Sequence, residues 1–313
     1  MAKYQFTVDA KAYIEEMRPH MKASSVKDKE RKLLLISNMF TSLYREGKVS
    51  SNNPRRITRE DVVAYVAYRR ENGISESTIS KDICLLNQLL LWVGNHEVEN
   101  FRAFAGVLKP RSYTGRKPAM EDVVIDRVMR LARETDDWKT LLGCTVVVVC
   151  TSCGLRPQEA RQLYADDVTL VDGRSVVHVE HVKGEGSWGH SRNVLVMDGA
   201  EDILRKYLSA RESMLRAHGK TTRAMFTPLN NDNEFYSQQG FGCLKQGIER
   251  AVGAKFQLRS GRRAYGQRLL NRGNSLEDVS VSMGHSSTKT TEEYYARYKE
   301  KDVMRRIMDR GLR

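Results

Sequence analysis

The chain is poor in long apolar runs and in cysteine. The first scarcity argues against a membrane-spanning protein, and the second argues against a zinc site or a disulfide framework. Apolar runs such as Val146 to Cys150 are far shorter than the roughly 20 residues that span a bilayer. The amino-terminal residues lack the apolar region of a secretory signal. The cysteines number five, an odd count, and only Cys150 and Cys153 stand close together, with no second Cys or His pair. We therefore expect a cytoplasmic protein whose cysteines are buried free thiols and not zinc ligands.

Acidic residues are also too few to balance the basic ones. The 313 residues include 52 Lys and Arg against 39 Asp and Glu, a formal net charge of +13. Residues 1–118 hold 21 basic and 13 acidic side chains, and the remainder holds 31 and 26. An excess of this size favours a polyanionic partner, because Lys and Arg release counterions when they meet phosphates. Charge kept only for solubility is the alternative. The 40% hydrophobic fraction suits a soluble globular chain, long enough for two domains.

Residues 8–107 show helical periodicity throughout, with breaks at Asn52-Asn53-Pro54 and Asn72-Gly73. Thr58 and Asp61 resemble a capping box, Ser75 begins another helix, and Ser24 and Ser25 are expected to cap an earlier one. Four or five helices with short breaks predict a compact helical bundle. No internal repeat or low-complexity segment interrupts it.

Residues 108–119 carry two prolines, one glycine and four basic side chains without apolar periodicity, and this predicts a basic interdomain linker. Residues 120–135 and 138–153 then read as helices. The β-branched run Val146–Val149 also suits a strand, but the length and flanks of its segment favour a buried helix.

Three short antiparallel strands follow, at residues 168–171, 175–182 and 192–197, the first two joined by an Asp172-Gly173 turn. Helices resume at Glu201. The chain is therefore expected to be mainly α with a small antiparallel β-sheet. Its domains are a helical domain at 1–107, the linker at 108–119, and a mixed α/β domain at 120–313 that ends in a tail helix.

Two segments of the second domain carry residues suited to binding an anion. Arg156 follows a glycine break and precedes Pro157, which occupies the first position of a new helix, so its side chain lies at a helix N-terminus. Glu159 is placed to hold that guanidinium. Lys183 lies at a turn rich in glycine. An ordinary helix-start arginine and a solvated hairpin lysine are the plainer interpretations.

A third segment, residues 256–295, brings further candidates. Arg259 and Arg262 are three residues apart on one helix face, a spacing that suits a phosphate clamp. His285 lies two residues after Met283, where a helix is expected to end, and Tyr294 lies among Ser and Thr hydroxyls. Each of these residues taken alone has a structural interpretation: exposed arginines, a buried histidine with a satisfied hydrogen bond, and a packed tyrosine.

Together the segments resemble the tyrosine recombinase, or phage integrase, family. Thr-Ser-Cys-Gly-Leu-Arg-Pro-Gln-Glu is similar to the family's Thr-Gly-Leu-Arg-x-x-Glu, and Met-Gly-His-Ser-Ser and Thr-Thr-Glu-Glu-Tyr match its later motifs. The motifs cover residues 120–298, and the helical pattern of residues 8–107 is similar to the family's core-binding domain. The resemblance implies a catalytic domain at 120–313 with these catalytic residues: Arg156, Lys183, Arg262, His285 and Tyr294.

One position departs from the family pattern. Where the family usually has His three residues before the second arginine, this chain has Arg259. A guanidinium stays protonated in proteins, so we count Arg259 as a sixth catalytic residue that is suited to binding phosphate and not to acting as a general base.

The resemblance also implies a mechanism. Tyr294 attacks a DNA phosphorus to form a 3′-phosphotyrosine, Lys183 protonates the departing oxygen, and the arginines and His285 bind the phosphate oxygens. Neighbouring cations must favour the phenolate, because a phenol with a pKa near about 10 is a weak nucleophile. The sequence contains no P-loop and no convincing metal-ligand cluster, so we expect no cofactor.

The implied partner is double-stranded DNA with a specific recombination site, bound by a homo-oligomer, the synaptic tetramer, and the protein of a prokaryote would associate with the nucleoid. An apolar stripe at Val303, Met304, Ile307, Met308 and Leu312 either packs on its own domain or docks on a neighbouring protomer. Candidate DNA contacts are basic or hydroxyl side chains of the first domain and the linker: Lys22, Lys27, Lys29, Arg31, Lys32, Thr78, Lys81, Arg111, Arg116 and Lys117. Two alternatives remain open, a catalytically impaired DNA-binding protein of the same fold and a type IB topoisomerase-like enzyme.

Overall fold

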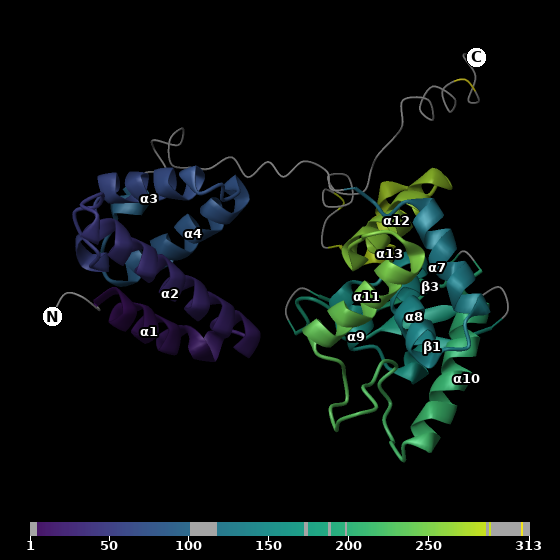
Figure 1. Cartoon of the computed structure of the whole chain (residues 1–313). Coiled ribbons are helices and arrows are strands. Elements are labelled where there is room, and N and C mark those ends of the chain that lie inside the picture. The colour runs from purple at the N-terminus through teal and green to yellow at the C-terminus, as the bar shows by residue number, and fades with distance from the viewer. Residues whose placement is uncertain are drawn as a thin grey trace. The chain divides into compact units, whose positions relative to one another are not determined.

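The computed structural model describes residues 5–100, 118–171, 175–186, 189–197, 199–285, 288 and 308. The chain divides into two compact units, Met1–Gly115 and Arg116–Arg313 (Figure 1). The boundary falls inside residues 108–119, the segment predicted as a linker, of which residues 108–117 lie outside the described part.

The first unit is helical where it is described. Its elements are α1 (Gln5–Met17), η2 (Arg18–His20), α2 (Ala23–Arg45), η3 (Pro54–Arg56), α3 (Arg59–Glu71), α4 (Glu76–Trp92) and α5 (Glu97–Asn100). Aromatic side chains form the centre of its core: Phe40 stacks on Tyr65 with ring centroids 5.1 Å apart, and Phe6 packs on Phe40 at 5.8 Å. Burial of these rings joins helices that would be marginal alone.

The helix starts test the sequence signals directly. Thr58 and Asp61 form the predicted capping box, and the Ser75 side chain accepts from the backbone N–H of Thr78. The prediction that Ser24 and Ser25 cap a helix is wrong, because α2 already begins at Ala23 with Lys22 at the N-cap position. No side chain caps this helix start, so the two serines did not predict where α2 begins.

The second unit is built around one buried helix. Its helices are α7 (Asp122–Glu134), α8 (Trp138–Ser152), α9 (Pro157–Arg161), α10 (Glu201–Ala217), α11 (Gln238–Val252), α12 (Leu258–Asn271) and α13 (Leu276–Met283), with a 3-10 turn, η5, at Ala165–Asp167. α8 contacts α7, α10, α11 and α12, and every residue from Leu141 to Ser152 is buried. The prediction of a helix over Val146–Val149 is confirmed, because burial on all sides overrides the β preference of valine.

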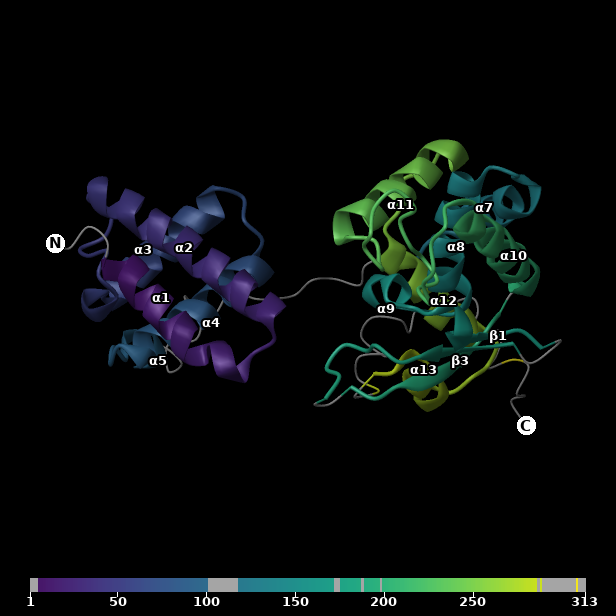
Figure 2. The same cartoon turned by 90° about the horizontal axis from the view of Figure 1, so that it is seen from below.

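A small sheet lies along one side of these helices (Figure 2). β1 (Val168–Thr169), β2 (Val176–Val179) and β3 (Arg192–Leu195) pair antiparallel in that order, with Val177 opposite Val168 and Val194. The strands are shorter than predicted, and Asp172 and Gly173 lie outside the described residues. Helix α13 packs beside β3. The predicted fold class, mainly α with a small antiparallel sheet, is confirmed.

The predictions about membrane-spanning helices and about the cysteines can be compared with the structure. Among the described residues, no helix combines the length and apolarity needed to cross a membrane. Cys144, Cys150 and Cys153 are buried as predicted, and burial raises the pKa of Cys144 and of Cys150 to about 12. For Cys84 and Cys243 the prediction of burial is wrong, because both lie exposed.

Candidate active site

Arg156 stands at the start of α9, as its sequence predicted. Pro157 occupies the first helical position and fixes the backbone there, so Arg156 becomes the N-cap residue. Its backbone N–H donates to Glu159 Oε2 at 2.8 Å and its Nη1 donates to Glu159 Oε1 at 2.5 Å. Nη2 donates to the carbonyl of Gly284 at 3.1 Å. The guanidinium is thereby held between the start of α9 and the end of α13.

Glu159 is the centre of this cluster. Its side chain is only 1% exposed, and three arginines converge on it. Besides Arg156, Arg192 donates from Nη2 to Oε2 at 2.8 Å and from Nη1 to Oε1 at 3.3 Å, and Arg262 Nη1 lies 3.6 Å from Oε2. Such a carboxylate fixes the direction of each guanidinium.

Arg262 enters the cluster from α12, where it is buried. Its Nη1 donates to the carbonyl of Gly154 at 2.7 Å, and its Nη2 donates to the carbonyl of Met283. Nη2 also lies 3.2 Å from Nε2 of His285. A guanidinium only donates, so Nε2 is the acceptor and the imidazole proton is on Nδ1.

The pKa values of two groups record the local field. Burial alone would raise the pKa of Glu159, but the hydrogen bonds from Arg192 and the charges of Arg192, Arg262 and Arg156 lower it to about 2. Burial, together with the charges of Arg262, Arg156 and Arg192, lowers the pKa of His285 to about 3. At neutral pH the cluster thus contains three guanidiniums, one carboxylate and a neutral imidazole.

Three guanidiniums against one carboxylate leave an excess of two positive charges in a largely buried setting. Arg156 keeps 23% of its side chain exposed, against 9% for Arg192 and 4% for Arg262. The cluster can therefore accept an anion with at least two acceptor oxygens at the side where Arg156 and His285 are accessible. A phosphodiester has this chemistry.

The other predicted residues divide into three outcomes. Lys183 is exposed in the connection between β2 and β3. Arg259 lies on α12 with Arg262, but Arg259 is exposed while Arg262 is buried, so the two present different surroundings to a ligand. Tyr294 lies outside the described residues.

The DNA-contact candidates of the first unit lie around the start of α2 and on α4. Lys22, Lys27, Arg31, Thr78 and Lys81 are exposed, whereas Lys29 and Lys32 are partly covered.

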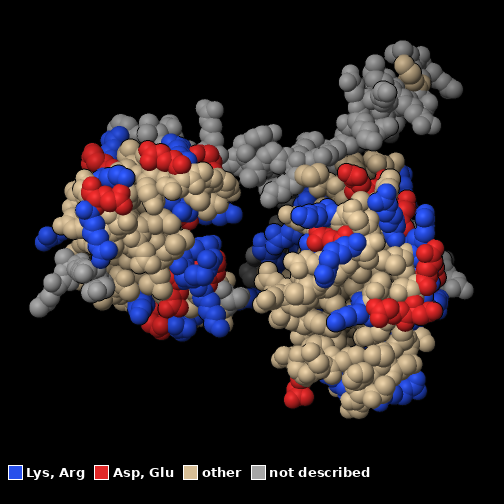
Figure 3. Space-filling model, viewed as in Figure 1, with Lys and Arg blue, Asp and Glu red and all other residues tan. Residues whose placement is uncertain are grey.

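Some of these candidates have partners in the unit itself. Arg31 and Lys32 both contact Asp28, at 3.1 and 2.7 Å, and Lys29 donates to Gln88 at 3.0 Å. Exposed ion pairs of this kind contribute little, so phosphates can displace them. Arg111, Arg116 and Lys117 lie outside the described residues. In Figure 3, acidic side chains are interspersed with basic ones on the visible face of both units.

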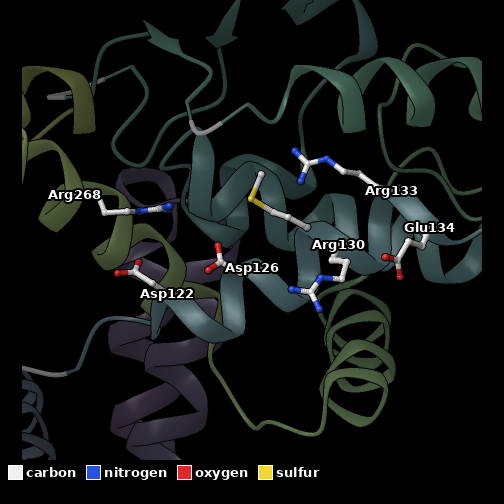
Figure 4. A pocket seen from close by; sticks show the side chains of 7 residues that line it. Asp122, Asp126, Arg130, Arg133, Glu134 and Arg268 are labelled. Atoms are coloured by element: carbon white, nitrogen blue, oxygen red, sulfur yellow. The ribbon is translucent and has the colours of Figure 1, made fainter.

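A separate hollow of about 460 Å³ lies along α7 and is closed on one side by Arg268 of α12 (Figure 4). Three carboxylates and three guanidiniums line it together with Met129: Asp122, Asp126, Glu134, Arg130, Arg133 and Arg268. Arg133 is bound by Asp202 at 2.6 Å, and Arg268 donates to the carbonyl of Thr151 at 2.6 Å. The balanced charges lack the positive excess of the arginine cluster.

Arg192 is the residue that sequence reasoning left out of the site. A usable signal was present: Arg192, Val194 and Val196 alternate from the start of the predicted strand, which places the arginine on the face of the two valines. In the structure both valines are buried. A charged residue at such a position requires a buried partner. Glu159 is that partner, but it lies in a different element, and the pattern alone does not identify it.

Comparison with known proteins places this chain in a family. Tyrosine recombinase XerD of Listeria monocytogenes serovar 1/2a is 24% identical over 298 residues, covering 93% of this chain and 94% of its own length. Tyrosine recombinase XerC of Herpetosiphon aurantiacus is 22% identical over 240 residues, covering 76% of this chain and 75% of its own.

Solved structures show the same fold. XerH site-specific recombinase bound to palindromic difH substrate, in a post-cleavage complex, superposes with a TM-score of 0.68 at 16% identity, over 96% of this chain and 83% of that one. The Tn1549 transposon integrase in complex with a circular intermediate DNA gives 0.66 at 16% identity, over 97% and 99%.

The family of the chain follows from the family model. The phage integrase family model matches residues 120–301, more than half of the chain, and the chain belongs to that family. It is therefore a tyrosine recombinase, and its activity is site-specific DNA recombination.

Proposed function

We propose that Arg156, Arg262 and His285 bind the scissile phosphate of a recombination site, and that Tyr294 attacks its phosphorus. The observation that carries the proposal is the convergence of the two arginines and the histidine around Glu159, with an excess of positive charge. Phosphoryl transfer depends mainly on positioning and on cations around the phosphate oxygens. The cluster supplies both before DNA arrives.

In the proposed reaction, the Tyr294 phenolate forms a bond to phosphorus while the bond from phosphorus to the 5′-oxygen breaks. Lys183 gives its proton to the departing oxygen, leaving a 5′-hydroxyl and a 3′-phosphotyrosine. In the reverse attack, the 5′-hydroxyl of another strand gives its proton to Lys183 and bonds to phosphorus, while the bond from phosphorus to the tyrosine oxygen breaks; this regenerates the phenolate and completes exchange. The covalent intermediate conserves the phosphodiester energy, so rejoining needs no separate energy source.

His285 changes role as the phosphate binds. In the free protein its Nε2 accepts from Arg262 and the pKa of its imidazole is lowered to about 3. A bound phosphate brings negative charge beside it, which raises that pKa and favours an imidazole that donates. Arg259, exposed on the same helix as Arg262, adds a phosphate contact and no general base, because its guanidinium does not lose a proton at neutral pH.

We further propose that the first unit and the basic linker bind the flanking duplex. Lys22, Lys27, Lys29, Arg31 and Lys32 would contact the backbone, with Thr78 and Lys81 on α4. Four protomers would form the synaptic complex, joined by the apolar stripe of residues 303–312. Of that stripe the structure describes only Met308, which is 71% exposed.

Covalent capture tests this function. The protein is incubated with fragmented DNA of its host, the mixture is denatured with detergent, and DNA that stays attached to the protein is sequenced. A nicked duplex made from the captured sequence then traps the adduct. Cleavage next to the nick releases a short fragment that carries the free 5′-hydroxyl, and once this fragment diffuses away it cannot attack the phosphotyrosine. We expect the unsubstituted protein to form the adduct and Tyr294→Phe to form none.

Tyr295→Phe is the matched control, since it removes a hydroxyl next to the proposed nucleophile. An adduct that survives Tyr294→Phe and disappears with Tyr295→Phe would move the nucleophile by one residue. No adduct with any host sequence would point to the catalytically impaired DNA-binding protein. Relaxation of a supercoiled plasmid that lacks the captured sequence would point to topoisomerase-like activity.

A further inference from the structure

Arg192 contacts three separate elements while being nearly buried. It begins β3, where it pairs with Val179 of β2, and its side chain is 9% exposed. Its Nη1 and Nη2 donate to the two carboxylate oxygens of Glu159 on α9, at 3.3 and 2.8 Å. Its Nε donates to the carbonyl of Ser282 on α13 at 3.1 Å. All three nitrogens of the guanidinium are thus committed to the protein.

The fit around Arg192 is tight at the turn that carries His285. A Cβ added to Gly284 would lie 2.9 Å from Arg192 Cδ and 3.1 Å from its Nε. The same glycine has a positive φ of 59°, and its carbonyl accepts from Arg156. The position of the Arg192 side chain is therefore coupled by contact to the backbone that presents His285 and orients Arg156.

Arg192 also belongs to the hairpin that carries Lys183. β2 and β3 pair from Val176–Leu195 to Val179–Arg192, and the turn between them contains Lys183. Arg192 of this hairpin is anchored to Glu159, which also holds Arg156. The hairpin, α9 and the end of α13 are therefore joined at a single guanidinium.

From these contacts we infer that Arg192 is a positioning residue of the recombination reaction, which sets the Lys183 hairpin in register with Arg156 and His285. The inference rests on the proposed function of those three residues. The role inferred for Arg192 depends on its contacts to Glu159 and Ser282 and not on a contact to the phosphate. It acts through the planar fork, which contacts both carboxylate oxygens while Nε reaches α13. Lysine keeps the charge but has one nitrogen and cannot make these contacts together.

The test compares Arg192→Lys with the unsubstituted protein on the nicked duplex of captured sequence. The first-order rate of adduct formation is measured at saturating protein, and the dissociation constant for an intact duplex is measured separately. We expect the rate to fall by at least about tenfold, because small displacements of reacting groups are costly in rate. The dissociation constant should change less than about twofold, since the contacts to the flanking duplex are assigned to the first unit and the linker.

Arg211→Lys is the matched control, because Arg211 is a buried arginine of the same unit whose fork donates to the carbonyls of Ala224 and Thr222. It should lose stability without a comparable loss of rate. If Arg192→Lys is poorly folded, the pair Arg192→Met with Glu159→Gln removes both charges at once. The rate of adduct formation in the double variant should then be no lower than in the slower of the two single variants, Arg192→Met and Glu159→Gln, as expected for residues that act as one unit.

The results distinguish the role of Arg192 from the proposed function of the site. If Arg192→Lys forms the adduct at the same rate as Arg211→Lys, the positioning role is refuted. It is also refuted if the rate losses of Arg192→Met and Glu159→Gln add up in the double variant. Neither result would affect the proposed function. If the unsubstituted protein forms no Tyr294-dependent adduct, the proposed function fails, and this inference fails with it.

Discussion

Glu159→Gln is the substitution that tests the arginine cluster most severely. It keeps the size and one oxygen of the side chain, but it replaces a carboxylate shared by three guanidiniums with a neutral amide. The amide nitrogen can only donate, and it would face guanidiniums that also only donate. We expect the second unit to lose about 3 kcal/mol of unfolding free energy at pH 7, the lower end of what removal of one partner from a buried ion pair costs.

The depressed pKa gives the same magnitude by a separate route. A glutamate pKa lowered from about 4.3 in the unfolded chain to about 2 in the folded one corresponds to about 3 kcal/mol of stabilisation. Because the folded pKa is the lower one, this stabilisation is fully present above the unfolded pKa and is lost as pH falls toward 2. The difference between the two proteins should therefore be constant above pH 6 and should shrink between about pH 5 and pH 3.

The assay is urea denaturation followed by circular dichroism at several pH values, with separate transitions fitted for the two units. The first unit provides an internal reference, since its transition should not move. Glu134→Gln, which removes an exposed carboxylate from α7, should change stability by less than about 0.5 kcal/mol. A loss below about 1 kcal/mol for Glu159→Gln, or a difference that does not shrink on acidification, would refute this account of the cluster.

Three further predictions follow from the same site. Gly154→Ala should destabilise the second unit by about 2 kcal/mol or more in urea denaturation, because φ is 64° and the new Cβ would lie 2.4 Å from the Tyr265 ring. Gly253→Ala is the control: its φ is 66° but nothing lies within 4 Å of the new Cβ, so it should lose only about 1 kcal/mol. The His285 imidazole should stay neutral from pH 8 to pH 5 in the free protein, as followed by NMR, given its pKa of about 3; titration near pH 6.5 would contradict the described surroundings. Arg259→His should add an acidic limb near about pH 6.5 to the single-turnover cleavage rate, and an unchanged profile would show that position 259 is remote from the reacting groups.

The sequence was informative where the structural cause is local. Pro157 at a first helical position and Glu159 two residues later define both the start of α9 and the partner of Arg156, and all three lie within one turn. The helix start at Thr58 is local in the same sense. The buried helix α8 was predictable because the length and flanks of its segment favour a helix over a strand.

The remaining features depend on contacts between distant segments. Arg192 meets Glu159 and Ser282, which are 33 and 90 residues away in the chain. Nothing in the residues around Arg192 names either partner. The lowered pKa of His285 arises from burial and from arginines on three elements, α9, α12 and β3, so it appears only after the chain has folded.

Glycines next to the catalytic motifs link the local and the distant causes. Arg262 donates to the carbonyls of Gly154 and Met283, so it grips two backbone turns, one before Arg156 and one before His285. Each turn contains a glycine with positive φ that has no room for a side chain, Gly154 against Tyr265 and Gly284 against Arg192. A side chain at either position would push the backbone away from the guanidinium that binds it. The glycines are therefore part of the site's geometry: they let two chain turns approach one buried arginine closely enough for their carbonyls to accept its hydrogen bonds.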